Sequence, residues 1–369
     1  MPSDEIVLSI LVITHNQASL LPRCLDSILA QQLRVPYEVI VSDDRSTDGT
    51  WAVVERYVAA HPGIVRGFRV NSDACSPADA AQRCGYNVSQ AYSRARGRFF
   101  VNVDGDDFLR GTDVYQQQID LLERHPECSM CMQNIWVVQA AAAIEEGDLW
   151  GPGDELQTGQ VLGAADFILG SRRVLNQGYL TRRNDSVDPV ARYGKFFDDT
   201  VITFHHLQFG DVVYLNRADY VYVKYPTSVD SSLRGDDREV IYGLLPLLHT
   251  ALVPRFAGLF LQADLEALLR LLELNLERPL QLDAQTRAVL AEFQGFVFRH
   301  VCDGEHAGPA ARARLARALR LGRAVLEGGS PVPVTLRRLY GVLIGSEAAR
   351  QIPSAHWECP ADAGTVSRG

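Results

Sequence analysis

Three short apolar runs in the first 110 residues each end in polar or acidic side chains. The runs are residues 7–13, 38–42 and 99–103, and the first two are followed by apolar residues at helical spacing. Buried strands that alternate with amphipathic helices predict βα units around a parallel sheet. In such a sheet the carboxyl ends of neighbouring strands form the edge at which ligands bind. The pattern therefore predicts an α/β domain with a polar site at that edge.

The remaining N-terminal elements are expected to continue this alternation. Helices are predicted over residues 18–31, 51–60, 79–93 and 200–209, and further strands over 64–70, 128–139, 175–183, 212–215 and 220–224. Residues 145–159, rich in glycine, proline and acidic side chains, are expected to form a mobile or substrate-facing loop.

The composition changes near residue 236, where leucine-, alanine- and arginine-rich helical patterns begin. We therefore predict two domains, an α/β domain over residues 1–235 and an α-helical domain over 236–369. One predicted helix of the second domain carries arginines opposite leucines. Its arginines are Arg312, Arg314, Arg317, Arg320 and Arg323. The helix has three interpretations: a core-packed helix with a solvated face, a peripheral contact with anionic lipid, or a homodimer contact.

Charge and cysteine content exclude some classes of function. The net charge of −9 argues against nucleic acid as a partner, because neutralising phosphates requires a basic surface. Seven scattered cysteines suit free thiols in a reducing compartment. The first residues lack the basic segment of a signal peptide, and no apolar stretch approaches a membrane span of about 20 residues. These features predict a cytoplasmic protein, with peripheral binding at the inner face of the membrane as the alternative.

The segment Val-Asn-Val-Asp-Gly-Asp-Asp at residues 101–107 sets three carboxylates within four positions directly after a strand. Crowded carboxylates repel one another, so such a cluster suits a divalent cation that also bridges phosphates. The alternative is a solvated acidic turn that caps the helix near Thr112. A second acidic turn, Asp-Asp-Arg-Ser-Thr-Asp-Gly-Thr at residues 43–50, follows another strand. There a carboxylate could accept from a base or a ribose, while Ser46 or Thr47 caps the next helix.

Taken together, these motifs resemble a known family. Residues 10–16 (Ile-Leu-Val-Ile-Thr-His-Asn), 41–50 and 96–107 are similar, in order and spacing, to the nucleotide-sugar-binding half of the family 2 glycosyltransferases. The resemblance covers roughly residues 6–230. It implies a GT-A fold, which is Rossmann-like with a mostly parallel sheet flanked by helices, here followed by the α-helical domain.

The resemblance also implies which residues bind the donor. His15 would lie against the nucleobase with Asn16 beside it, and Asp44 would accept a hydrogen bond from the base. Asp104 would contact the ribose, and Asp106 would hold Mn²⁺ or Mg²⁺ against the diphosphate. The full implied set is Thr14, His15, Asn16, Asp44, Arg83, Asp104 and Gly105 for the nucleotide sugar, with Asp106 for the metal.

Two positions depart from the family's usual residues. Tyr86 stands where an arginine is usual, so Arg83, one helical turn earlier, would supply the charge to phosphate. The pair Asp198-Asp199 stands where Glu-Asp is common, and Asp199 matches the catalytic base. The implied mechanism is a single displacement with inversion, in which Asp199 takes the proton of an acceptor hydroxyl. The alternative for the pair is a helix N-cap.

The expected activity is transfer of one sugar from a nucleotide-sugar donor, preferably UDP-linked, to a glycan, lipid-linked or protein acceptor. Processive synthases of the superfamily carry a Gln-x-x-Arg-Trp motif and membrane spans, and neither occurs in this sequence. The family suggests bacterial surface-glycan or glycoconjugate synthesis and a hexosyl- or N-acetylhexosaminyltransferase. A catalytically silent nucleotide- or glycan-binding protein is the alternative, and intact Asp104, Asp106 and Asp199 argue against it.

Other motifs are interpreted as structural. Cys128 and Cys131 have the spacing of half a zinc site, but a second pair is absent, so buried thiols are expected. His205 and His206 are adjacent on a predicted helix and cannot form one metal-binding face. The tyrosines near the end of the domain are expected to pack the strands, with a sugar-binding aromatic shelf as the alternative. They are Tyr214, Tyr220, Tyr222 and Tyr225.

Overall fold

The computed structural model of the chain describes residues 5–70, 80–140, 142–168, 178–183, 203 and 205–226. The chain divides into two compact units, and the described residues all belong to the first, which comprises Met1–Arg234 with Leu252–Phe256. The predicted helical domain and its arginine-rich helix lie outside the described residues, so the boundary at residue 236 stays a prediction. Within the described part of the chain, no helix is both long and apolar enough to cross a bilayer.

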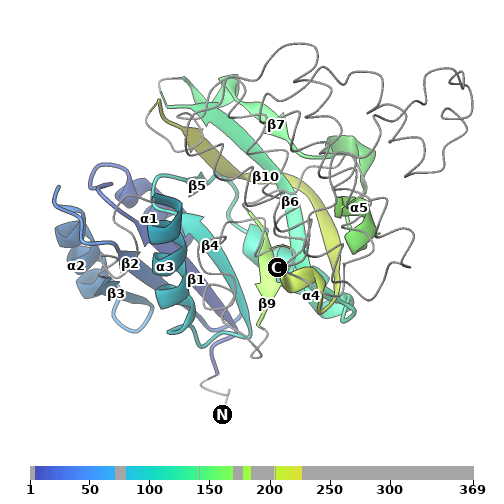
Figure 1. Cartoon of the computed structure of the whole chain (residues 1–369), viewed down its shortest axis with the longest axis horizontal. Coiled ribbons are helices and arrows are strands. Elements are labelled where there is room, and N and C mark those ends of the chain that lie inside the picture. The colour runs from blue at the N-terminus through green and yellow to red at the C-terminus, as the bar shows by residue number, and fades with distance from the viewer. Residues whose placement is uncertain are drawn as a thin grey trace, which may run out of the picture. The chain divides into compact units, whose positions relative to one another are not determined.

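One mixed sheet organises the first unit (Figure 1). Its main path runs β3 (Val65–Arg69), β2 (Tyr37–Asp43), β1 (Leu8–Thr14), β4 (Phe99–Asp104), β9 (Leu180–Arg182), β6 (Cys128–Gln139), β10 (Asp211–Lys224) and β5 (Phe108–Leu109). The strands β3, β2, β1 and β4 pair in parallel, as the alternation of strands and helices predicts. Beyond β4 the sheet becomes mixed, because the short β9 pairs antiparallel with both β4 and β6.

Helices cover both faces of the parallel part. Side chains of α1 (Leu21–Leu29), α2 (Thr50–Ala60) and α4 (Val114–Arg124) share one buried core with Leu8, Ile10 and Val12 of β1. Helix α3 (Ala80–Tyr92) packs on β1 and β2 from the other face, where its Asn87 hydrogen-bonds Ser42. Alternate residues of β1 thus face two helical layers, which explains why the strand is buried along its whole length and mostly apolar.

The predicted elements are found close to their expected positions, with three informative differences. Helix α1 begins at Leu21 because residues 16–18 are hydrogen-bonded to the 46–50 turn instead. Residues 145–159 are more regular than a loop, because β7 (Asp148–Trp150) pairs with β6 and lies between the short 3₁₀ helices η2 (Ile144–Glu146) and η3 (Gly153–Glu155). The strands expected at 212–215 and 220–224 form one strand, β10, with a register shift between Leu215 and Tyr220.

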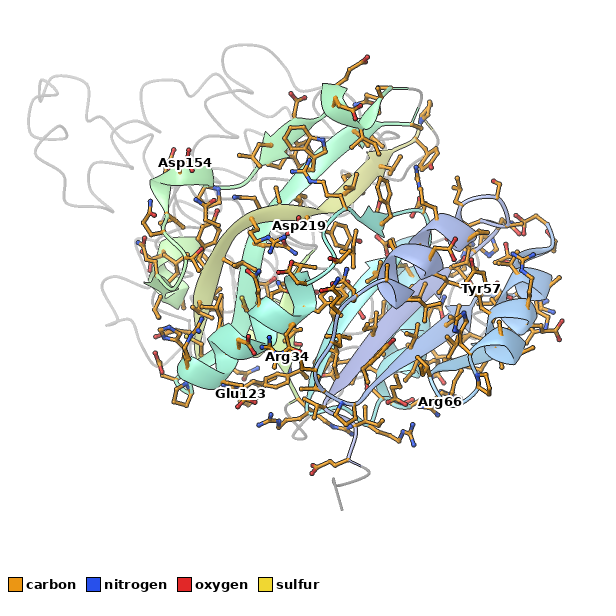
Figure 2. All side chains as sticks on the ribbon, turned by 180° about the vertical axis from the view of Figure 1, so that it is seen from behind. Arg34, Tyr57, Arg66, Glu123, Asp154 and Asp219 are labelled. Atoms are coloured by element: carbon orange, nitrogen blue, oxygen red, sulfur yellow. The ribbon has the colours of Figure 1, made fainter. Side chains whose placement is uncertain are left out.

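The polar residues within that register shift explain why the sequence suggested a break. Arg217 pairs with Asp219 at 2.5 Å, and Asn216 donates to Asp154 at 3.2 Å. Asp154 and Asp219 are labelled in Figure 2. Such side chains are typical of a turn, but here they lie on a bulge of β10. The strand pairs with β6 both before and after this bulge. Two further short elements, β8 (Val161–Leu162) and α5 (Ala164–Ile168), follow the 145–159 segment, and β8 pairs with β10.

Candidate functional site

The carboxyl ends of β1, β2 and β4 lie side by side. In the strand register Thr14 is opposite Asp43, and Ile13 is opposite Asp104. The backbone pairing continues past the strands, because the amide of Asp44 donates to the Thr14 carbonyl at 3.0 Å and that of Gly105 donates to the Ile13 carbonyl at 2.9 Å. The strand ends that the sequence marked as polar are therefore brought to one edge, as the parallel topology requires.

The turn after β1 is tied to the turn after β2. The amide of Asn16 donates to Ser46 Oγ at 2.8 Å, and Asn16 Oδ1 accepts from the amide of Thr47 at 2.8 Å. Asn16 has a φ of 52°, a left-handed conformation that asparagine tolerates better than most residues. Below it, the amide of Gln17 donates to Thr50 Oγ1 at 2.8 Å. The two turns thus form one continuous polar surface.

His15 is exposed and oriented by two hydrogen bonds. Its Nδ1 lies 2.7 Å from the carbonyl oxygen of Asp44, which can only accept, so Nδ1 carries a proton. Its Nε2 lies 3.1 Å from Asn16 Nδ2, which donates to it. The two contacts hold the imidazole in one orientation, with its exposed ring available to an aromatic base.

Asp43 and Asp44 are adjacent but differ in what they do. The Asp43 carboxylate is fully buried, accepts from the backbone and hydroxyl of Ser46, and pairs with Arg69 Nε at 3.1 Å. These contacts hold the turn in shape. Asp44 is also buried and lies next to His15 through its carbonyl oxygen.

The prediction that Ser46 or Thr47 caps α2 is wrong. The N-cap residue is Gly49, which has a φ of 94° and offers no side chain. Asp48 supplies the acceptors instead, because its carboxylate accepts from the amides of Thr50 and Ala18, each at 3.0 Å. Ser46 is used to join Asp43 to Asn16, so its hydroxyl is committed elsewhere.

The acidic turn after β4 separates its carboxylates into two kinds. Asp107 is fully buried: its Oδ2 accepts from the Tyr220 hydroxyl and its Oδ1 from the Val223 amide, each at 2.8 Å. It therefore fastens the turn to β10. Asp104 and Asp106 are only partly buried and lie at the strand edge. The alternative that this turn caps the helix near Thr112 does not hold, because β5 intervenes and Asp113 is the N-cap of α4.

The electrostatics of the turn favour a cation. Burial, followed by the nearby charge of Asp106, raises the pKa of Asp104 to about 7. Burial also raises the pKa of Asp106, although hydrogen bonds from its own amide and from Gln17, and the charge of Arg23, oppose the rise. Burial and the charges of Asp104 and Asp106 raise the pKa of Asp107. A divalent cation at Asp104 and Asp106 would relieve this crowding.

Two residues of this region were missed by sequence reasoning. Gln17 accepts from Thr14 Oγ1 at 2.8 Å and hydrogen-bonds Asp106, so it joins the β1 turn to the acidic turn. Arg23 of α1 contacts the Asp106 carbonyl oxygen at 3.3 Å. Neither carries a sequence signal, because each is a polar residue on an otherwise ordinary turn or helix.

The remaining predicted site residues, Gly105, Arg83 and Asp199, belong to three separate segments of the chain. Gly105 lies under the β1 turn, where an added Cβ would be 2.5 Å from Gln17 Oε1 and 3.0 Å from Thr14 Oγ1. Arg83 is partly buried on α3. Asp199 lies outside the described residues. The described residues that follow it are helical where expected, and the His206 carbonyl oxygen accepts from Ser129 Oγ at 2.8 Å, against β6.

Most of the residues interpreted as structural are buried, while Tyr222 and Tyr225 are only partly buried. Cys128 and Cys131 are free, buried thiols of β6, as expected. His205 and His206 are buried too, and the His206 ring lies 5.5 Å from that of Phe100. Of the tyrosines, Tyr214 and Tyr220 are fully enclosed in β10.

A family model matches the N-terminal part of the chain. Residues 9–140 match the family model described as Glycosyl transferase family 2. The protein named Uncharacterized protein Rv1520, of Mycobacterium tuberculosis strain H37Rv, is 25% identical over 312 residues, which are 85% of this chain and 79% of that protein. The poly(ribitol-phosphate) beta-glucosyltransferase of Bacillus spizizenii is 31% identical over 104 residues, 28% of this chain and 15% of that protein.

Solved structures agree on the fold. The crystal structure of S. aureus TarS residues 1–349 has a TM-score of 0.56 and 15% identity, with 92% of each chain covered. Structures of the same TarS fragment have been solved with UDP and with UDP-GlcNAc. The likeness confirms the GT-A fold expected from the three motifs.

Proposed function

Because residues 9–140 match the model of glycosyl transferase family 2, we propose that the protein moves one sugar from a nucleotide-sugar donor to an acceptor hydroxyl by an inverting single displacement. The observation that carries the proposal is the shared edge of β1, β2 and β4. There an oriented His15 lies beside Asp44 through a 2.7 Å contact, and the carboxylates of Asp104 and Asp106 belong to the neighbouring strand end.

The nucleoside would lie on the two joined turns. The exposed His15 ring offers a flat surface to the base, and Asn16 holds that ring through its 3.1 Å contact with Nε2. Asp44 would accept from a base N–H, and Thr14 and Gly105 would line the floor. We propose UDP as the nucleotide, and the UDP complexes of the structurally similar TarS support that choice.

Asp104 and Asp106 fit a divalent metal. Carboxylate oxygens are the ligands that Mg²⁺ and Mn²⁺ prefer. Burial, followed by the charge of Asp106, raises the pKa of Asp104 to about 7, and a bound cation would stabilise the ionised carboxylates. Asp107 would take no part, because both of its oxygens are used by β10. When bound, the metal would neutralise the diphosphate as it leaves. Asp106 would hold it, with Asp104 directed to the ribose side.

The proton of the acceptor would go to Asp199. Because attack comes from the side opposite the leaving diphosphate, the product would have the inverted anomeric configuration. The described helical residues 205–207, which follow Asp199 in the chain, lie against β6 and near Phe100 of β4. Arg83 stays a proposed phosphate contact from α3.

The acceptor is proposed to be a glycan, a lipid-linked intermediate or a protein, in bacterial surface-glycan or glycoconjugate synthesis at the cytoplasmic face. The name of the similar Bacillus protein, a poly(ribitol-phosphate) beta-glucosyltransferase, supports a polymeric acceptor. A hexosyl or N-acetylhexosaminyl donor is proposed on the same ground and on the UDP-GlcNAc complex of TarS. The arginine-rich helix beyond residue 308 would serve membrane docking or dimerisation.

A calorimetric comparison of UDP, GDP, TDP and CMP, each with Mn²⁺, tests the nucleotide. We expect UDP to bind at least tenfold more tightly than the other three. Asp44 and the adjoining turn would read the base edge against GDP and CMP, and Asp104 on the ribose side would favour the 2′-hydroxyl that TDP lacks. NMR of the product formed from a glycan acceptor and UDP-glucose or UDP-GlcNAc should then show a β-linked sugar, because inversion converts the α-linkage of the donor to β. Binding of none of the four nucleotides would favour a silent protein of the same fold.

A further inference from the structure

Arg23 of α1 lies against the acidic turn in a fixed orientation. Its guanidinium carbon is 4.2 Å from the centre of the Phe108 ring, and its Nη2 donates to the Asp106 carbonyl oxygen at 3.3 Å. Phe108 is buried, so it provides a rigid base for the stack. The side chain nevertheless remains exposed, which leaves part of the guanidinium fork open to a ligand.

Two further groups meet Arg23 at the same point. Its positive charge acts on the Asp106 carboxylate, and it hydrogen-bonds the hydroxyl of Tyr225, which follows the end of β10. The cation therefore stands where the acidic turn, helix α1 and the end of β10 come together. The sequence offered Arg83 as the phosphate contact, and the structure adds Arg23 through its contacts with Asp106.

The positive charge of Arg23 beside this carboxylate cluster would stabilise an anion that binds at the same point. A divalent metal balances only Asp104 and Asp106, and a diphosphate brings at least two more negative charges to the same point. A guanidinium binds phosphate oxygens with two parallel hydrogen bonds. Because Arg23 is already held on Phe108, little side-chain freedom would be lost when it binds.

We propose that Arg23 is a binding residue for the diphosphate of the nucleotide donor, contacting phosphate oxygens next to the metal held by Asp106. The inference rests on the proposed function, since it requires a nucleoside diphosphate in this site. Phe108 is then a positioning residue, because it orients the guanidinium without touching the ligand.

The test compares three ligands on the full chain with Arg23→Gln, and with Arg34→Gln as the matched control. Arg34, labelled in Figure 2, is an exposed arginine paired with Asp120 at 2.7 Å. UDP is titrated by calorimetry with Mn²⁺, uridine by ligand-observed NMR, and Mn²⁺ alone by electron paramagnetic resonance. These ligands separate the contacts to phosphate, to nucleoside and to metal.

We expect Arg23→Gln to weaken UDP binding about tenfold or more while uridine binding stays within twofold. Affinity for Mn²⁺ alone should hold or rise, because a positive charge next to Asp106 has been removed. The Arg34→Gln control should match the wild type for all three ligands. Unchanged UDP affinity in Arg23→Gln would overturn the inference, as would a parallel loss for UDP, uridine and Mn²⁺, which indicates a structural role.

A second variant guards against a folding defect. Arg23→Lys keeps the charge but not the two-pronged geometry, so a smaller loss of affinity, confined to UDP, supports the inference. If Arg23→Gln does not fold, Arg23→Lys alone decides, and an unchanged UDP affinity in Arg23→Lys overturns the inference. Failure of the proposed function has a different signature: the wild type itself would bind neither UDP nor uridine, and both claims would fall together.

Discussion

The carboxylate of Asp107 accepts a hydrogen bond of 2.8 Å from the hydroxyl of Tyr220, which lies 113 residues further along the chain. The same carboxylate accepts from the Val223 amide at 2.8 Å. These two contacts distinguish Asp107, which stabilises the fold, from Asp104 and Asp106, which lie at the edge of the candidate site. Neighbouring residues of one motif therefore have separable effects.

Asp107→Ala should destabilise the protein, and Asp106→Ala should not. Loss of Asp107 leaves a buried hydroxyl and a buried amide without a partner, which costs about 2–4 kcal/mol of unfolding free energy. Asp106 is partly exposed, so its removal should change stability by less than about 0.5 kcal/mol, or raise it slightly by relieving repulsion. Urea unfolding followed by circular dichroism measures both. Equal destabilisation by the two variants would refute this division.

Gly105→Ala should weaken nucleotide binding more than it affects stability. The added Cβ would lie 2.5 Å from Gln17 Oε1 and 3.0 Å from Thr14 Oγ1, so both side chains must move away from the edge. UDP affinity should fall by about tenfold, with a stability change of about 1 kcal/mol or less, since side chains rather than backbone are displaced. Gly163→Ala is the control, because the nearest atom to its Cβ is 3.7 Å away. Equal UDP affinities in the two variants would contradict the close packing.

The acid stability of the domain should depend on Glu38. This buried carboxylate accepts from Ser9 Oγ at 2.7 Å, the Arg96 amide at 2.8 Å and Arg66 Nη2 at 2.6 Å, and Figure 2 labels Arg66. Burial alone would raise the pKa of Glu38, but hydrogen bonds from Arg96, Ser9 and Arg66 lower it overall. A lowered native pKa stabilises the fold above the unfolded-state pKa, and this stability is lost as the pH falls through the native pKa.

Glu38→Gln should therefore lose about 1–3 kcal/mol at pH 7, less than a fully enclosed ion pair because both arginines are partly exposed. The difference from the wild type should shrink as the pH falls below about 4. Urea titrations at pH 7, 5, 4 and 3 give the comparison. If the difference in unfolding free energy between the wild type and Glu38→Gln stayed constant over this pH range, ionisation of Glu38 would not be what stabilises the fold.

His206 should make the protein less stable in mild acid. Burial, followed by the charge of His205, lowers the pKa of His206 to about 3, and neither ring nitrogen has a hydrogen-bond partner within the described part of the chain. Between the unfolded-state pKa of about 6.5 and that value, only the unfolded chain takes up the proton, so stability falls with falling pH.

His206→Phe keeps a flat ring next to Phe100 and cannot titrate. Its unfolding free energy should fall less steeply than that of the wild type between pH 6 and pH 4, by up to about 1.4 kcal/mol per pH unit. His125→Gln, at a partly exposed histidine, is the control. Parallel pH profiles for His206→Phe and the wild type would show that this imidazole is not buried in the neutral form.

The sequence was sufficient to predict the parallel half of the sheet, because β1, β2 and β4 are continuous apolar runs that end in recognisable motifs. It did not reveal β5 and β8, since these strands have two residues each and no periodicity can be detected over such lengths. The strand predicted over 175–183 is present as β9, but its antiparallel pairing with β4 and β6 was not predicted. The division of β10 into two strands had a physical cause as well: the polar bulge at Arg217 and Asp219 looks like a turn.

The sequence was sufficient to predict the site as a set of strand ends, but it did not predict the role of each acidic residue. Asp43 and Asp44, or Asp106 and Asp107, are equivalent as sequence letters, and only contacts from Arg69 and from Tyr220 distinguish them. Gln17 and Arg23 could not be found for the same reason, because their importance comes from what lies beside them in space.

The central claim is that the acidic turn holds a metal against the diphosphate of a nucleotide. Calorimetric titration of the full chain with UDP, in Mn²⁺ and again in EDTA, tests it most directly, with Asp106→Ala and Asp120→Asn, at a partly exposed aspartate of α4, as paired variants. We expect the wild type and Asp120→Asn to bind UDP at least tenfold more tightly with Mn²⁺ than with EDTA, and Asp106→Ala to lose that difference. UDP binding that is equal with and without metal, or that survives unchanged in Asp106→Ala, would contradict the claim.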